Sequence, residues 1–313
     1  MRIVVFGVGG VGGYFGGKLA NAGMDVTFIA RGKNLQALKE KGLRVDSLEG
    51  DFVVNPVQAT ENPSEVGQVD AVILGVKAWQ VPAAADYLRP LIGTNSYVLP
   101  LQNGVEACDQ LAAVLGENHV MGGLCYVVSF IVAPGHIKHA GMVPRIIFGE
   151  LDGRRSDRSE LLLKAFSAAG VGAEISPDIN VSIWEKFLFI ASLSGVGAVT
   201  RVPVGVARAI PETRRLYEQC IKEIASLAEA RGVKLEQGAA GITMAKIDSL
   251  PPEATASMQR DIMAGLPSEL SGQNGAVVRL AKEAGISTPV NDFFYASLLP
   301  QEQSAGAEAQ SKN

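Results

Sequence analysis

A glycine-rich turn close to the start of the chain restricts the fold more than any other feature. The residues Arg2–Phe6 form an apolar strand pattern, and the pattern G-x-G-x-x-G at residues 7–12 follows it directly. The next stretch, Gly10–Ala22, predicts a helix that ends at Gly23. A strand, such a turn and a helix in immediate succession are typical of a dinucleotide-binding unit. The alternative is an ordinary glycine-rich turn between a strand and a helix.

Each glycine of the turn has its own physical task in a dinucleotide site. Gly7 permits the tight turn, Gly9 lets the backbone approach a pyrophosphate, and Gly12 lets the helix pack closely on the strand. The free N–H groups at the start of the helix, together with its dipole, then favour a bound phosphate. We therefore predict cofactor contacts along the whole turn, at Gly7, Val8, Gly9, Gly10, Val11 and Gly12.

The residue after the second strand indicates which dinucleotide is bound. Val26–Ala30 is the second strand pattern, and Arg31 follows it directly. NAD enzymes usually hold the ribose 2′-hydroxyl with an acidic residue here, whereas an arginine suits the 2′-phosphate of NADP. Lys33 adds positive charge, and Asp25 lies at the wrong end of the strand. The sequence therefore favours NADP as the cofactor, the alternative being a solvent-exposed arginine.

Two further strand patterns, Ala71–Val76 and Ser96–Leu101, alternate with helical segments. Such alternation predicts βαβ units and a parallel sheet. Ligands of open α/β sheets bind at the carboxyl ends of the strands. Lys77 and Asn103 follow these two strands, so both are candidates for contact with the cofactor or the substrate. The alternatives are a solvent-exposed lysine and an ordinary Asn-Gly turn.

The pattern changes twice further along the chain. Between residues 123 and 150, strand patterns with a Pro-Gly turn indicate antiparallel strands. After Asn180 the strand signals stop, and apolar residues recur every three or four positions, as in helices. We predict a Rossmann-type α/β domain at 1–178 and an all-helical domain at 179–313. The helical segments expected there include 216–227, Met258–Ala264, Gly275–Ala284 and Phe293–Leu299.

Composition narrows the class of protein. Apolar residues make up 47% of the chain and charged residues 19%, which is ample for buried cores. The net charge of −4 offers no basic surface for nucleic acid. Cys108, Cys125 and Cys220 form no CxxC motif, which suits a reducing compartment. We expect no signal peptide, no apolar run long enough to span a bilayer and no membrane partner, and therefore a soluble cytoplasmic protein.

The histidines do not suggest a metal or nucleophile site. His136 and His139 are three residues apart, so they fall on opposite faces of a strand, and His119 is distant in the sequence. No zinc site is predicted, and no nucleophile elbow supports a Ser-His-Asp triad.

Five motifs, taken together, resemble those of the ketopantoate reductase (2-dehydropantoate 2-reductase) family. They are GVGGVG at 7–12, LGVKAWQ at 74–80, LQNGV at 101–105, WEK at 184–186 and SMQRDIMAGLPSEL at 257–270. The resemblance covers nearly the whole chain in the expected order. It implies a Rossmann-type NADP domain joined to a helical domain, and NADPH-dependent reduction of a 2-oxo acid, with ketopantoate giving pantoate on the route to coenzyme A.

The resemblance also implies roles for individual residues. Lys186 corresponds to the catalytic lysine, Ser257 to a substrate-binding residue, and Glu269 to a contact with the substrate or with the ribose end of the cofactor. In the first domain, it implies pyrophosphate contacts at Gly7, Gly9 and Gly12, a 2′-phosphate contact at Arg31, and contacts on the nicotinamide side at Lys77 and Asn103.

Three positions depart from the family pattern on the substrate side. Family members often carry asparagines four and eight residues after the lysine, where this chain has Ile190 and Ser194. A further asparagine, three residues before Ser257, is replaced by Ala254. We still expect Ile190 and Ser194 to line the substrate, in a less polar pocket. This leaves open a different oxo acid, an imine or an opine-type product as the substrate.

The local sequence around Lys186 bears on its chemistry. Reducing a 2-oxo acid requires a hydride at C2 and a proton on the carbonyl oxygen, and a lysine can supply that proton and stabilise the developing alkoxide. The capping-box pattern at 182–185 predicts a helix that starts at Ser182, with Lys186 near its positive end. A start at Asp178 would weaken this dipole argument, and without the resemblance a solvated helix lysine is the simpler explanation.

Pro267 interrupts the helical pattern that begins near Ser257. Glu269 should therefore lie close to the start of the next helix, where a carboxylate is stabilised in its ionised form. The alternatives are a capping charge for Glu269 and an N-terminal cap for Ser257.

Two further possibilities stay open from the sequence. One is a non-catalytic sensor that binds NADP(H) without turnover. The other is a homodimer, because the helical half is rich in apolar residues.

Overall fold

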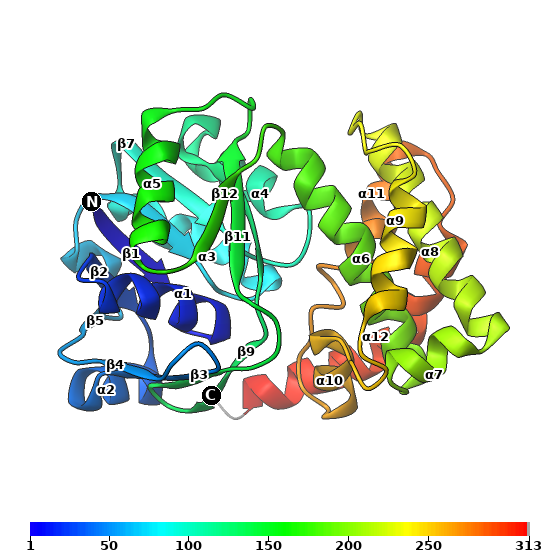
Figure 1. The fold of residues 1–313 in the computed structure, drawn as a ribbon, viewed down its shortest axis with the longest axis horizontal. Helices are drawn as coiled ribbons and strands as arrows, with labels where there is room; N and C mark the ends of the chain where they lie inside the picture. Colours follow the sequence, from blue (N-terminus) through cyan, green and yellow to red (C-terminus); the bar gives the residue numbers. More distant parts are fainter. Residues whose placement is uncertain (312–313) are drawn as a thin grey trace. The chain divides into compact units, whose positions relative to one another are not determined.

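The computed structural model describes residues 1–311 and divides them into two compact units (Figure 1). The first unit contains residues 1–102 and 107–182. The second contains the short segment Asn103–Glu106 and the chain from Ile183 onward. The division therefore falls inside a helix rather than in a loop, because one helix runs across residues 182 and 183.

The first unit is an α/β structure. Its strands are β1 (Arg2–Phe6), β2 (Asp25–Ile29), β3 (Leu43–Ser47), β4 (Phe52–Val54), β5 (Gln58–Thr60), β6 (Val69–Leu74), β7 (Ile92–Pro100), β8 (Met121–Tyr126), β9 (Ser129–Ala133), β10 (His136–His139), β11 (Arg145–Glu150) and β12 (Gly172–Ile175). Its helices are α1 (Gly10–Asn21), α2 (Gly32–Lys41), α3 (Val81–Leu88), α4 (Ala107–Leu115) and α5 (Asp157–Ala168).

The central sheet has the order β5-β2-β1-β6-β7, and all of its neighbouring strands are parallel. The predicted parallel sheet is therefore confirmed. The chain moves outward from β1 to β2 and β5 and then returns to the other side of β1 with β6. Such a reversal of strand order is the point at which ligands bind in open α/β sheets.

Apolar residues on both faces of the sheet explain why it is covered on both sides. Along β1, Ile3 and Val5 belong to one core, which α1 and α5 cover, whereas Val4 and Phe6 belong to a second core, which α3 and α4 cover. A strand that is buried on both faces needs a continuous apolar run, and RIVVF supplies one. The buried strand that the apolar run Arg2–Phe6 predicts is thus confirmed.

Two smaller sheets extend the first unit. The predicted Pro-Gly hairpin is confirmed, because β9 and β10 are antiparallel on either side of Pro134-Gly135. They continue into a four-stranded sheet of order β4-β3-β10-β9. The segment Arg145–Glu150 pairs with β8 antiparallel, in a three-stranded sheet of order β12-β11-β8. The sequence analysis did not predict β3, β4, β5 or β12, which are short.

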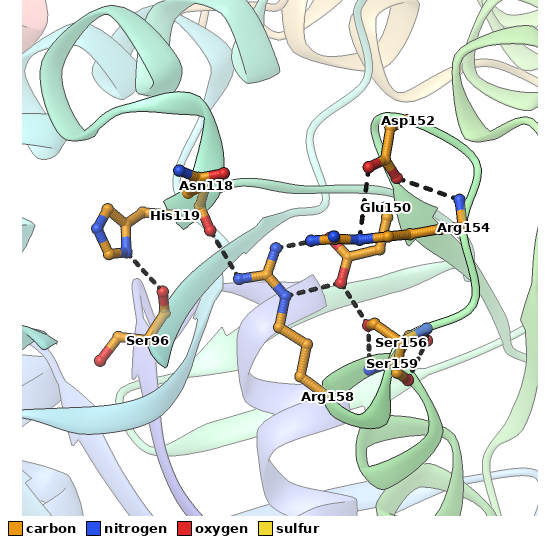
Figure 2. A network of polar contacts seen from close by, with 9 residues as sticks. All are labelled: Ser96, Asn118, His119, Glu150, Asp152, Arg154, Ser156, Arg158 and Ser159. Atoms are coloured by element: carbon orange, nitrogen blue, oxygen red, sulfur yellow. Dashed lines mark hydrogen bonds and ion pairs between the residues drawn. The ribbon is translucent and has the colours of Figure 1, made fainter. Parts of the chain in front are cut away.

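A buried ion pair joins helix α5 to strand β11 in this unit. The guanidinium of Arg158 on α5 contacts both carboxylate oxygens of Glu150 on β11, at 2.7 and 2.6 Å (Figure 2). Ser156 donates a further hydrogen bond to Glu150, and Arg158 also donates to the carbonyl of Asn118. Burial alone raises the pKa of Glu150, but the hydrogen bonds from Arg158 and Ser156 outweigh it, so the pKa lies below its usual value. The Arg158 guanidinium also lies 5.3 Å from the ring centroid of Tyr97.

The second unit is helical, and no strand occurs in its described residues, as predicted. Its helices are α6 (Ile179–Thr200), α7 (Val204–Ala209), α8 (Pro211–Ala230), α9 (Ala239–Ser249), α10 (Ser257–Met263), α11 (Asn274–Ala284) and α12 (Pro289–Ser311), of which the first four residues of α6 fall in the first unit. Helix α8 packs against α9, α11 and α12, and its buried residues include Tyr217, Ile221 and Ile224 (Figure 1). Helices α7 and α9 were not predicted.

The structure of helix α6 contradicts two predictions from the sequence. It begins at Ile179, not at Ser182, because the Asp178 carboxylate accepts a hydrogen bond from the N–H of Val181 and so caps the helix one turn earlier. It also contradicts the expectation that no apolar run could span a bilayer, since α6 is long and apolar enough by composition. In the fold, 61% of its most apolar window is buried, as in the core helix of a globular protein.

Candidate functional site

The glycine turn after β1 is closely packed at Gly7 and Gly12 and open at Gly9. Gly7 has a φ of 95°, in the left-handed region, and a Cβ there would stand 2.7 Å from Val76. A Cβ on Gly12 would stand 2.1 Å from the Gly7 carbonyl oxygen, so only glycine lets α1 approach the turn this closely. At Gly9 the nearest atom to such a Cβ is the Gly75 oxygen at 3.8 Å. The backbone at Gly9 is therefore open, as the approach of a ligand demands.

Gly10 has a role that the sequence did not reveal. A Cβ at this first residue of α1 would stand 2.2 Å from the carbonyl oxygen of Ser129 on β9. The absence of a side chain at Gly10 thus lets the β9–β10 hairpin pack against the start of α1. A contact of Gly10 with a cofactor stays a prediction.

Asn34 fixes the glycine turn in place. Its amide nitrogen donates to the Val8 carbonyl at 3.0 Å, and its amide oxygen accepts from the N–H of Gly135 at 2.8 Å. One side chain on α2 therefore joins the glycine turn to the turn between β9 and β10. The sequence analysis missed Asn34, because no local pattern indicates which distant backbone groups an asparagine will bind.

Gln102 has a similar role at the end of β7. Its buried amide nitrogen donates to the carbonyls of Leu74 and Val76, at 2.8 and 2.9 Å. These carbonyls belong to the end of β6 and to the loop that carries Lys77. In the sequence Gln102 stands out only as part of LQNGV, and its contacts show that it shapes the Lys77 loop at the carboxyl edge of the sheet.

Lys77 and Asn103 occupy different units. Lys77 is exposed at the carboxyl end of β6, with its ammonium 5.6 Å from the ring centroid of Trp79. Asn103 is partly buried, in the segment that groups with the helical unit. A contact of either residue with the nicotinamide side of a cofactor stays a prediction.

The segment Asn103–Glu106 is attached to the helical unit by specific contacts. The Glu106 carboxylate lies 2.7 Å from the guanidinium of Arg279 on α11. The carbonyl oxygen of Gly272 lies 3.0 Å from the position that a Cβ of Gly104 would take. This brings the segment of Asn103 next to the chain that follows Glu269.

Arg31 lies where the sequence predicted it, directly after β2. It is the N-cap residue of α2, and its side chain is exposed, as is that of Lys33. Two cationic side chains therefore flank the start of α2, whose N-terminal N–H groups add to the positive potential. This arrangement is suited to a phosphate group.

Lys186 lies in the middle of α6, and its side chain is only 9% exposed. Because α6 begins at Ile179, Lys186 is in the third turn rather than the first. The effect of the helix dipole fades within one turn, so the predicted dipole argument for Lys186 is wrong. The burial of its side chain is what distinguishes this lysine from a solvated one.

Ser182, Ile190 and Ser194 share one face of α6 with Lys186, at spacings of four residues, and they differ in exposure. Ser182 is partly exposed and shares a hydrogen bond of 2.8 Å with Ser176. Ile190 is partly exposed, whereas Ser194 is fully buried and its hydroxyl has no partner among the described residues. Contact of Ile190 or Ser194 with a substrate stays a prediction.

The structure excludes the alternative role of Ser257, whereas contact of Ser257 or Glu269 with a substrate or cofactor stays a prediction. Ala256 is the N-cap of α10, so the alternative of Ser257 as a capping residue is wrong. Glu269 is 5% exposed and lies in the turn between α10 and α11, five residues before α11 begins at Asn274. The Glu269 carbonyl oxygen accepts from the N–H of Gln273 at 2.9 Å, so a helix-like turn leads from Glu269 into α11, and stabilisation of its carboxylate by a helix start stays a prediction.

Within the described residues, no group of three or more His, Cys, Asp or Glu side chains is arranged to hold a metal ion. His136 instead pairs with Asp46 at 2.8 Å, and His139 is buried against Ser47 at 2.9 Å. These contacts give both histidines a structural role in the β9–β10 region.

Comparison with known proteins places this arrangement in a family. The sequence model of ketopantoate reductase PanE/ApbA matches residues 3–153, and the model of its C-terminal part matches residues 178–302. The uncharacterized oxidoreductase YkpB of Bacillus subtilis is 33% identical over 96% of this chain and 99% of its own. The 2-dehydropantoate 2-reductase of Mesorhizobium japonicum is 31% identical over 95% of this chain and 96% of its own.

A solved structure agrees with these matches. The PanE/ApbA family ketopantoate reductase from Ralstonia eutropha superposes with a TM-score of 0.89 at 30% identity, covering 98% of this chain and 100% of that chain. The fold and the glycine turn define a dinucleotide-binding oxidoreductase. The chain belongs to the PanE/ApbA ketopantoate reductase family, which acts on small 2-oxo acids. The predicted family and fold class are confirmed.

Proposed function

We propose that this protein reduces a 2-oxo acid with NADPH, and that 2-dehydropantoate (ketopantoate), which gives pantoate, is its favoured substrate. The observation that carries the proposal is the match of both family models, one to each part of the chain, together with relatives named 2-dehydropantoate 2-reductase. Pantoate formation would place the enzyme in pantothenate biosynthesis.

The first unit has features suited to NADPH. The open backbone at Gly9 leaves room for the pyrophosphate, and the N–H groups at the start of α1 favour its charge. The exposed guanidinium of Arg31 can bind the 2′-phosphate through two N–H groups at once. No acidic residue stands at the end of β2 to bind a 2′-hydroxyl instead, so these residues support NADPH over NADH.

The residues of the helical unit support the proton transfer. Bound NADPH supplies the hydride to C2 of the 2-oxo acid. Lys186 donates the proton to the carbonyl oxygen, and its ammonium stabilises negative charge as it develops there. Ser257 binds the substrate, and Glu269 binds the substrate or the ribose of the cofactor. Burial of Lys186 strengthens its electrostatic effect, because water screens its charge less.

The proposal is tested by following NADPH absorbance with ketopantoate and a panel of other 2-oxo acids. Lys186→Ala should lower turnover by several orders of magnitude while NADPH still binds. Lys222→Ala is the matched control, since Lys222 is an exposed lysine on α8 of the same unit. Absence of NADPH oxidation with every acid would reject the proposal, and unchanged turnover of Lys186→Ala would remove Lys186 from its role.

Cofactor choice has a separate test. Arg31→Asp should weaken NADPH binding by about 2–3 kcal/mol, as the loss of a charge-assisted phosphate contact does. It should also shift the preference toward NADH. Titration of each cofactor by its fluorescence measures both effects, and a preference for NADH in the unmodified protein would overturn this assignment of Arg31.

One observation favours a different 2-oxo acid, or an imine, as a second candidate substrate. Ile190 is partly exposed one turn beyond Lys186, and Ala254 is partly exposed too, so apolar groups stand where family members often carry asparagines. Specificity constants across the acid panel separate the two candidates. Tight NADPH binding without turnover on any acid would instead identify a non-catalytic sensor.

We also propose a cytoplasmic location. The three cysteines, Cys108, Cys125 and Cys220, are all free, which suits a reducing compartment.

A further inference from the structure

The Arg31 side chain has an aromatic partner that no sequence motif indicates. Its guanidinium carbon lies 5.2 Å from the ring centroid of Tyr87 on α3, within the range of a cation–π contact. The buried residues of α3 (Val81, Ala84, Ala85 and Leu88) face the core. Tyr87 lies on the other side of the helix, 53% exposed, so it is not held there by burial. An exposed aromatic ring beside an exposed cation calls for a functional explanation.

The bonding of Arg31 differs from that of most arginines in the same unit. Arg44, Arg89 and Arg158 each have a carboxylate partner, at 2.8, 3.1 and 2.6 Å. Within residues 1–311, no hydrogen-bond acceptor or carboxylate is found for Arg31, whose polar contact is the Tyr87 ring. Asp86, beside Tyr87 in the sequence, does not compete for Arg31, because Arg89 binds its carboxylate. The N–H donors of Arg31 are thus available to a ligand.

We propose that Tyr87 is a positioning residue, which holds the Arg31 guanidinium ready for the 2′-phosphate of NADPH. This inference rests on the proposed NADPH dependence. The two contacts are compatible, since an aromatic ring binds the face of a guanidinium, whereas a phosphate binds the N–H groups at its edge. The ring restricts an otherwise mobile arginine, so less conformational entropy is lost when the phosphate binds.

Binding measurements with both cofactors test the positioning role. Tyr87→Ala should weaken NADPH binding about two- to fivefold, the size expected for an exposed cation–π contact, and leave NADH binding unchanged. Tyr87→Phe should retain wild-type affinity, because the ring rather than the hydroxyl makes the contact. Binding of 2′,5′-ADP and 5′-AMP should show the same difference without the nicotinamide half. Phe293→Ala is the control, since Phe293 is an exposed aromatic on α12.

A double-mutant cycle shows whether Tyr87 acts through Arg31. In the Arg31→Ala background, Tyr87→Ala should have no further effect on NADPH binding. Arg145→Ala controls for the loss of a positive charge, because the Arg145 guanidinium also lies on a tyrosine ring, 4.4 Å from the centroid of Tyr126. This control variant should leave the ratio of NADPH to NADH affinity unchanged. An effect of Tyr87→Ala that persists without Arg31, or that is equal for NADPH and NADH, would overturn the inference.

The outcomes also separate this inference from the proposed function. If Arg31→Ala selectively weakens NADPH and Tyr87→Ala does not, only the role of Tyr87 is wrong. If Arg31→Ala has no selective effect, the assignment of the 2′-phosphate to Arg31 fails, and with it the inference. If the unmodified protein binds neither cofactor, the proposed function itself fails.

Discussion

Two buried polar side chains, one from each unit, differ sharply in their hydrogen bonding. In the first unit, Glu150 is 3% exposed, and both of its oxygens are bonded by Arg158 (Figure 2). In the helical unit, Gln273 is fully buried, and neither its amide oxygen nor its nitrogen has a partner among the described residues. A buried polar group that is hydrogen-bonded helps to maintain the fold. A buried polar group without a partner lowers the free energy of unfolding by about 1–3 kcal/mol.

Asn274 and Asn291 show an intermediate case in the same helical core. The Asn291 amide oxygen accepts from Asn274 at 2.9 Å, and its nitrogen donates to Glu223 at 2.7 Å. The amide oxygen of Asn274 has no partner among the described residues, and the same is true of the Ser194 hydroxyl. The core of the helical unit thus contains a hydrogen-bonded pair, Glu223 on α8 and Asn291 on α12, together with two atoms that have no partner among the described residues, on α6 and α11. Burial by itself does not show whether a polar residue stabilises the fold, but its bonding does.

The greatest loss of stability is expected for a substitution in the first unit. Arg158→Leu leaves the Glu150 carboxylate buried without its cation, which should lower the free energy of unfolding by about 3 kcal/mol. Urea unfolding at pH 7 measures the loss. Arg155→Leu is the control, because Arg155 is 63% exposed and its ion pair with Glu160 is a surface pair. An equal loss in both variants would remove the distinction between a buried and an exposed pair.

A somewhat smaller loss is expected in the helical unit. Asn291→Leu removes hydrogen bonds to Glu223 and Asn274, leaving the Asn274 amide only its longer bond of 3.4 Å to the Ala191 carbonyl, and should lower the free energy of unfolding by about 2 kcal/mol. Thermal and urea unfolding measure this effect. A loss below about 0.5 kcal/mol would mean that the bonding of Asn291 is replaced by water or by another side chain.

For a substitution of Gln273, we expect a gain in stability instead of a loss. Gln273→Met keeps the size of the side chain but removes two unpaired polar atoms, so the free energy of unfolding should rise by about 1 kcal/mol. The side chain does not cap α11, so no cap is lost. Destabilisation instead of a gain would indicate that the amide has a partner, such as a buried water.

The smallest effect concerns acid stability. The folded pKa of Glu150 is lowered, so its contribution is present above the unfolded pKa, about 4.3, and is lost as pH falls through the folded value. The difference in stability between the wild type and Glu150→Gln should therefore shrink between pH 5 and strongly acidic pH. Urea unfolding across this range measures it. A constant difference would show that the ionisation of Glu150 is not coupled to folding.

Local sequence patterns predicted those parts of the fold that neighbouring residues determine. The glycine turn, the strand before it and the position of Arg31 each depend on a few consecutive residues, and the structure places all three as expected. The capping-box pattern at 182–185 was a local signal that failed. Asp178 caps the helix first, and Ile179, 1% exposed, is buried in the fold. The helix therefore starts at the earlier cap, Asp178, which the sequence had left open as an alternative start.

Local sequence patterns were sufficient to predict the α/β class of the first part, the helical class of the second and the glycine turn, because backbone sterics and apolar periodicity act over short stretches. The contacts of Asn34 with the glycine turn, of Gln102 with the Lys77 loop and of Tyr87 with Arg31 emerge only in the folded protein. Each of these contacts joins segments far apart in the chain. Their partners are selected when the sheet assembles, and no pattern within one segment specifies them.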